Sequence, residues 1–108
     1  MGSTVGMTYD STKRVATGAN LDIRSLASGL AKRIRVTNLA NMHVAEYNEA
    51  LNDGEALVRT NTGTLTLVTT TGFTPLAGSS TQPPGFRLGI LPNINDTTTE
   101  NLLIEAWG

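Results

Sequence analysis

The stretch RIRVTNL, residues Arg33–Leu39, alternates charged or polar side chains with the apolar Ile34 and Val36. The same period of two runs through three further stretches, TLTLVT (Thr64–Thr69), FRLGI (Phe86–Ile90) and LLIEAW (Leu102–Trp107). Successive side chains of a strand point to opposite faces of a sheet, so this period is typical of strands with one buried face. Several such strands in a chain of 108 residues predict an all-β, single-domain antiparallel β-sandwich or small barrel.

The composition is that of a globular domain with an uncharged polar surface. Hydrophobic residues make up 39% of the chain, enough for a core, while charged residues make up 16%, below the roughly 25% of an average soluble domain. The formal charge is −1 and there is no cysteine, so disulfides, thiolate nucleophiles and cysteine metal sites are excluded. The sequence shows neither an apolar run near 18 residues nor a signal-peptide pattern. We therefore expect folding in the cytosol or stabilisation by self-association, and no membrane partner.

The first residues differ from the rest in pattern. Residues 1–14 are small, polar and weakly periodic, which predicts a flexible N-terminal arm followed by a β-sandwich domain over residues 15–108. Within the arm, Tyr9 offers an aromatic anchor, and Lys13 and Arg14 offer charge for an acidic partner surface. These three residues are therefore candidate interface residues.

The segment Asn41–Leu57 has two interpretations. Val44, Tyr47 and Leu51 have the spacing of one helical face, but Asn41–Asn48 also alternates as a strand does. We favour a strand to about Asn48 followed by a turn, because the neighbouring segments have period two.

No constellation of catalytic or metal-binding residues stands out. His43 is the single histidine, and no second histidine or cysteine accompanies it as a zinc ligand. Glu46 and Glu49 lie three residues apart and lack the aromatic cleft that usually surrounds glycosidase carboxylates. The sequence therefore predicts no enzyme activity and no catalytic, metal-binding or cofactor-binding residues.

Arg33 and Arg35 share one face of the expected strand. This basic pair allows a solvated face, a nucleic-acid contact or a salt-bridging contact to an acidic protein. We favour the solvated face over nucleic acid, because a duplex-binding protein normally shows a concentrated basic patch. Trp107 is expected to point away from Leu102 and Ile104, and so to need a partner. A neighbouring subunit is the predicted partner, and a sugar-stacking platform with Tyr9 and Tyr47 is the alternative.

Three segments carry a resemblance to a known family. They are KRIRVTNLANMHVAEYNEAL (residues 32–51), TLTLVTTTGFTPLAGSSTQPPGFRLGI (residues 64–90) and LLIEAWG (residues 102–108). Their motifs are the strand at Lys32–Leu39, the acidic-aromatic Ala45–Tyr47, the TLVTxxGxTP pattern at Thr66–Pro75, GFxxG at Gly85–Gly89, and Trp107. Together they resemble a family of small structural proteins of tailed bacteriophages.

The resemblance implies a virion protein with a jelly-roll-like sandwich, assembled in the host cytoplasm. The expected role is a head decoration or cement protein that binds the major capsid protein from outside, with a homotrimer as the expected oligomer. A fibre-base or other minor virion part and a carbohydrate-binding module are the alternatives.

Overall fold

The computed structural model describes residues 9–24 and 32–108. It contains eight strands: β1 (Tyr9–Val15), β2 (Leu21–Arg24), β3 (Arg33–Asn38), β4 (Val44–Asn48), β5 (Glu55–Arg59), β6 (Leu65–Leu76), β7 (Gly85–Leu88) and β8 (Asn101–Trp107). Among the described residues, no helix has the length and hydrophobicity needed to cross a bilayer.

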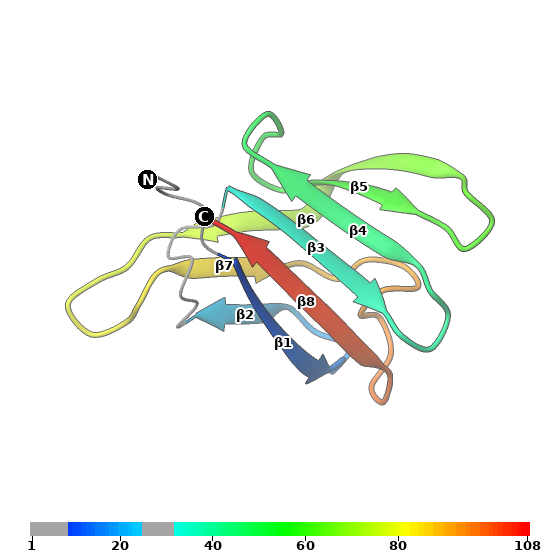
Figure 1. Ribbon diagram of the computed structural model, residues 1–108, viewed down its shortest axis with the longest axis horizontal. Coiled ribbons are helices and arrows are strands. Elements are labelled where there is room, and N and C mark those ends of the chain that lie inside the picture. The colour runs from blue at the N-terminus through cyan, green and yellow to red at the C-terminus, as the bar shows by residue number, and fades with distance from the viewer. Residues whose placement is uncertain (1–8, 25–31) are drawn as a thin grey trace, which may run out of the picture.

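All eight strands belong to one antiparallel sheet in the order β1-β8-β3-β4-β5-β6-β7-β2 (Figure 1). Strands β3 to β7 follow one another as a meander, while β8 returns to lie between β3 and β1. The sheet therefore has β1 and β2 as its two edges. The prediction of an all-β antiparallel fold is confirmed, and the strands form one continuous sheet.

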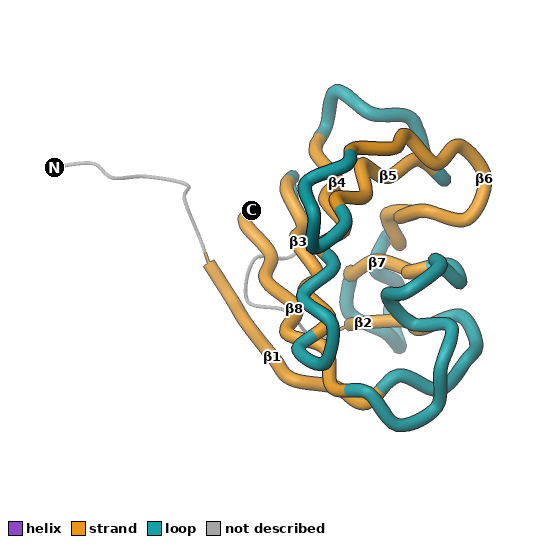
Figure 2. The backbone as a smooth tube through the Cα atoms, turned by 90° about the vertical axis from the view of Figure 1, so that its right-hand side faces the viewer, coloured by secondary structure: helices purple, strands orange, loops and turns teal. Residues whose placement is uncertain are grey.

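The sheet curls into a half-barrel because β6 bends (Figure 2). The first part of β6 pairs with β5, where Val68 lies opposite Ala56. The last part of β6 pairs with β7, and Phe73 in this part also lies opposite Glu55 of β5. The intervening residues have no partner across β5, and such an irregularity bends a strand. At the bend, a Cβ on Gly72 would collide with the backbone of Glu55, so the two strands approach this closely only because residue 72 is glycine.

The core lies inside the curl. Ile34 and Val36 of β3 and Leu102 and Ile104 of β8 are almost completely buried, as their alternation predicts. From the other wall, Phe73 and Phe86 meet edge to face at 5.7 Å. Burial of these side chains is the main stabilising contribution, at ~1.5–3 kcal/mol for each large apolar residue.

Two buried asparagines order the segment after β7: Asn38 joins it to the sheet, and Asn95 bonds within it. The Asn38 side chain donates from Nδ2 to the carbonyl of Ile94 at 2.8 Å and to Glu100 Oε1 at 2.9 Å. Asn95 accepts from the backbone N–H of Leu91 at 2.8 Å through Oδ1. Each amide meets its hydrogen-bonding requirement within the fold, so neither asparagine destabilises the interior.

Two predictions about local structure, the N-terminal arm and the segment before Asn48, can be compared with the structure. The predicted flexible arm is wrong for residues 9–14, because Tyr9–Val15 forms strand β1 and pairs with β8 over its full length. Residues 1–8 of the predicted arm lie outside the described residues. The strand interpretation of Val44–Asn48 is confirmed, and the helical alternative is wrong.

Candidate functional site

The side of the sheet turned away from the core carries the candidate site. We call it the outer face: the outward side chains of β1, β8, β3, β4, β5 and the first part of β6. Cross-strand register places Tyr9 beside Trp107, Trp107 beside Arg33, and Leu57 beside Leu67 on this face. Exposed apolar side chains are distributed over it or at its border: Tyr9, Val15, Leu39, Met42, Leu65 and Leu67. Exposed apolar surface is a feature of interaction sites.

One end of the outer face holds an aromatic and basic cluster around Trp107. The Tyr9 and Trp107 rings lie 5.3 Å apart, centroid to centroid. The guanidinium carbons of Arg33 and Arg35 lie 4.7 Å and 5.6 Å from the Trp107 centroid, within cation–π range. Trp107 thus has partners from β1 and β3 of its own chain. From the sequence, a neighbouring subunit was expected to supply its partner.

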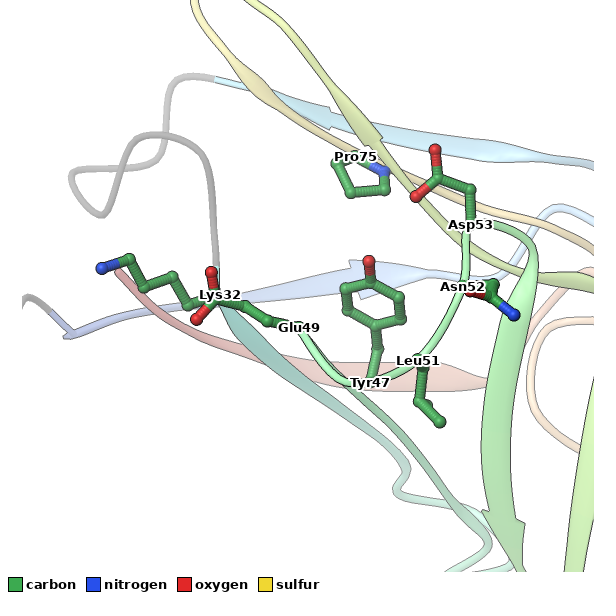
Figure 3. A pocket seen from close by; sticks show the side chains of 7 residues that line it. All are labelled: Lys32, Tyr47, Glu49, Leu51, Asn52, Asp53 and Pro75. Carbon is green, nitrogen blue, oxygen red and sulfur yellow. The ribbon is translucent and has the colours of Figure 1, made fainter.

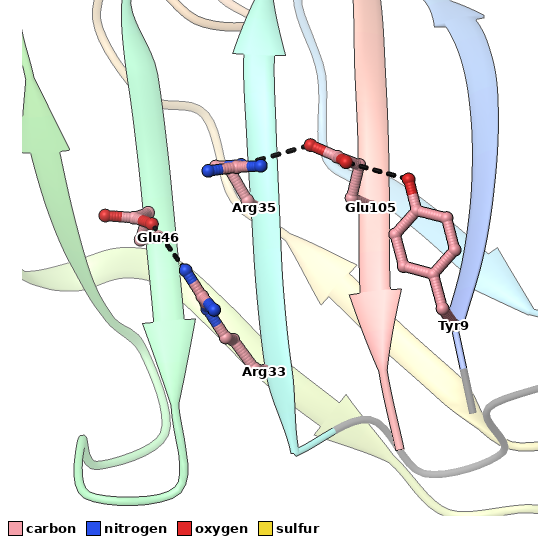
Figure 4. Close-up of polar contacts among 5 residues, drawn as sticks. All are labelled: Tyr9, Arg33, Arg35, Glu46 and Glu105. Carbon is pink, nitrogen blue, oxygen red and sulfur yellow. Dashed lines mark hydrogen bonds and ion pairs between the residues drawn. The ribbon is translucent and has the colours of Figure 1, made fainter. Parts of the chain in front are cut away.

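Two carboxylates neutralise this cluster (Figure 4). Glu105 Oε1 accepts from Arg35 Nε at 3.0 Å, and Glu105 Oε2 accepts from the Tyr9 hydroxyl at 2.8 Å. Arg33 Nη2 lies 3.4 Å from Glu46 Oε2. The hydrogen bond from Tyr9, with the ion pair to Arg35, holds the pKa of Glu105 below its ordinary value. Donation to that carboxylate in turn raises the pKa of the Tyr9 hydroxyl.

The middle of the outer face is a shallow groove of about 480 Å³ with both apolar and charged side chains in its lining. Val44 and Leu103 line it from β4 and β8, and Leu39 and Met42 line it from the turn after β3. Met42 has a φ of 62°, a left-handed conformation that few bulky residues adopt, and its side chain is exposed. Arg35 and Arg59 also line the groove, with Glu46 and Glu105.

The structure brings four of the six candidate interface residues into contact and separates the other two. Tyr9, Trp107, Arg33 and Arg35 form the cluster described above. Lys13 shares their face, because its register partner Leu103 lies in the groove. Arg14, the neighbour of Lys13 along the strand, projects from the opposite face.

A second hollow is an open depression of about 620 Å³ beside the turn after β4 (Figure 3). Its lining includes Tyr47, whose hydroxyl points toward Pro75 and Asp53 in Figure 3. Desolvation raises the pKa of Tyr47, so its phenol stays protonated at neutral pH and acts only as a hydrogen-bonding group. Tyr47 is buried on the inner side of the sheet, away from Tyr9 and Trp107, so the three aromatics do not form a shared platform.

Within residues 9–24 and 32–108, no cluster of three or more histidine, cysteine, aspartate or glutamate side chains could hold a metal ion. His43 lies beside its own turn, with Nδ1 3.4 Å from the carbonyl oxygen of Asn41.

Sequence reasoning missed the exposed Leu65 and Leu67. Their alternation in TLTLVT correctly indicates a strand, but it does not say which side is buried. In the structure Val68 turns inward against the core and the two leucines turn outward. That both leucines face outward can be seen only once the curl of the sheet is known.

Comparison of the chain with protein-family models, with curated proteins and with solved structures finds no match to any of them.

Proposed function

We propose that this protein is a structural component of a tailed-phage virion, a decoration protein that binds the major capsid protein on the outside of the head. The observation that carries the proposal is the outer face, a broad β-surface with exposed apolar side chains around a shallow groove. The sequence resemblance supplies the virion setting. The jelly-roll-like sandwich implied by that resemblance stays a prediction, because the eight strands form one curled sheet.

The charges of the outer face specify the partner's chemistry. Arg33 and Arg35 are paired with Glu46 and Glu105, so part of their charge is neutralised within the chain. Among the described residues, neither Lys13 nor Arg59 forms an ion pair, and both lie on this face. A groove with apolar side chains and Arg59 in its lining, and with Lys13 on the same face, fits a capsid surface that presents apolar side chains with carboxylates beside them.

The test measures binding to heads of the encoding phage that were assembled without this protein. Leu67→Glu should reduce occupancy at least about tenfold, because it places a charge at an exposed apolar position of the outer face. Ile90→Glu is the matched control, since Ile90 is also exposed but lies beyond β7, outside the outer face, and it should bind as the wild type does. Equal binding of both variants would show that the outer face is not the capsid contact.

Mass spectrometry of complete virions tests the role itself. A copy number comparable to the major capsid protein is the expected result. A few copies per particle would instead indicate a fibre base or other minor part. Absence from the virion would overturn the proposal and leave a binding module as the explanation.

A further inference from the structure

Strand β1 uses only one of its two edges in the described fold. It pairs with β8, and no described strand lies along its other side. The backbone N–H of Ala16 donates to the carbonyl of Glu100 at 2.8 Å. This bond shows which residues direct their backbone groups toward β8. In an antiparallel pair alternate residues bond to the partner strand, so the even-numbered residues of β1 face β8. The backbone groups of Tyr9, Ser11, Lys13 and Val15 therefore face outward along the free edge.

The sequence of this strand, YDSTKRV, is complementary to itself when read in the opposite direction. In an antiparallel pairing of two copies centred on Thr12, Tyr9 lies opposite Val15, Asp10 opposite Arg14, Ser11 opposite Lys13, and Thr12 opposite its own counterpart. Aromatic with β-branched, threonine with threonine, and acid with base are the cross-strand pairs that stabilise antiparallel sheets. Tyr9 and Val15 are 52% and 51% exposed, so each has apolar surface left to bury.

We propose that two copies of this chain associate through their β1 edges, antiparallel and centred on Thr12. The neighbouring registers are less favourable. Centring on Lys13 would place two lysines opposite each other, and centring on Ser11 would place Tyr9 opposite Lys13. Only the Thr12 register places Asp10 opposite Arg14 twice, once on each side of the two-fold axis.

The pairing changes the hydrogen bonding of the edge. The N–H of Ser11 donates to the carboxylate of Asp10 at 2.9 Å, which is consistent with its facing away from β8. In the dimer this N–H donates to the backbone carbonyl of Lys13 in the second copy, and the Asp10 carboxylate turns toward Arg14 of that copy. The two-fold axis stands perpendicular to the sheet, so both outer faces point the same way and form one continuous surface.

Sedimentation velocity of the purified full chain over a range of concentrations tests the pairing. We expect a monomer–dimer equilibrium. Asp10→Arg or Arg14→Asp alone should weaken the dimer at least about tenfold, because each places like charges opposite one another at two positions. The double variant D10R/R14D restores opposite charges and should recover the dimer. A monomer at every concentration, a trimer without a dimer, or a double variant that stays as weak as the single variants would each overturn the proposal.

Cysteine crosslinking tests the register. The chain has no cysteine, so Thr12→Cys introduces one thiol at the two-fold axis. Directly opposite residues in antiparallel strands lie within disulfide range, and mild oxidation should convert this variant to a covalent dimer. Ser11→Cys, one position away and pointing to the other face, is the matched control and should stay uncrosslinked. Equal crosslinking of the two variants would contradict the register. Because these experiments use the protein without a virion, their result is independent of the proposed capsid role.

Discussion

At the scale of single residues, Glu105 connects three strands. It belongs to β8, accepts a hydrogen bond from Tyr9 of β1 and forms an ion pair with Arg35 of β3. Its side chain is only 13% exposed, so these partners replace most of its contact with water. The carboxylate thereby links the edge strand to the interior of the sheet on the outer face.

The pH dependence of the stability of the fold should reveal the contribution of Glu105. The pKa of Glu105 lies below its ordinary value of 4.5, so the folded chain binds this proton less tightly than the unfolded chain does. Its stabilising contribution is therefore complete above about pH 4.5 and is lost as the pH falls toward the folded pKa. Glu105→Gln should lower the melting temperature at neutral pH and flatten its dependence on pH below 4.5. Differential scanning calorimetry at several pH values measures both effects.

Glu49→Gln is the matched control, because Glu49 is an exposed carboxylate in the turn after β4. It should keep the pH dependence of the wild type. If Glu105→Gln also kept that dependence, the contacts of Glu105 would contribute nothing to acid sensitivity.

The sequence identified part of this site. Trp107, Arg33 and Arg35 were expected outside the core because period two places them opposite the apolar positions of their strands, and the structure confirms that placement. Glu105 was not singled out as a site residue, because its contacts with Tyr9 and Arg35 depend on β1 and β3 lying on either side of β8. That adjacency joins residues separated by most of the chain, and local patterns carry no information about it.

At the scale of elements, β6 determines the curvature of the sheet. It is the longest strand and contributes to both walls of the half-barrel. Gly72 stands at its bend, where the backbone N–H of Gly72 donates to the carbonyl of Gly54 at 2.9 Å and its own carbonyl accepts from Gly89 at 3.0 Å. Three segments thus meet at one residue without a side chain.

Gly72→Ala should be strongly destabilising. The added Cβ would collide with the backbone of Glu55, and rotation of a side chain cannot relieve a clash with backbone. We expect a loss of about 1–3 kcal/mol in unfolding free energy, the usual range for overpacked sites. Urea unfolding measures it, with the exposed neighbour Thr71→Ala as a control that should change stability by less than about 0.5 kcal/mol. A Gly72→Ala variant as stable as the control would show that the bend has room to relax.

Elements with strong alternation were predictable, and the edge strand was not. Strands β3, β7 and β8 match their predicted segments to within two residues, because buried alternating side chains leave a clear pattern. Strand β1 buries little, so its sequence shows no apolar period and resembles that of a loop. Its structure depends on hydrogen bonding along β8, which is a tertiary contribution that no local pattern records.

At the scale of the whole molecule, the first described strand lies against the last. Tyr9 begins β1 and lies directly opposite Trp107, which ends β8. Pairs such as β1 with β8 and β2 with β7 join distant parts of the sequence, and closing such long loops slows folding. The arrangement also means that β8 could continue into β1 as a simple hairpin.

A circular permutant should exploit this arrangement and retain the fold. It joins Gly108 to Thr8 through an inserted Asn-Gly turn and opens the chain between Thr62 and Gly63, in the exposed turn after β5. Thr62 and Gly63 lie outside the core and outside the strands, so we expect a stability within about 1 kcal/mol of the wild type, or about 4–8 °C in melting temperature. A second permutant opened between Arg35 and Val36 interrupts a central strand at a buried residue and should not fold. If the first permutant also failed to fold, the pairing of β1 with β8 would not be sufficient to hold the first and last strands of the described chain together.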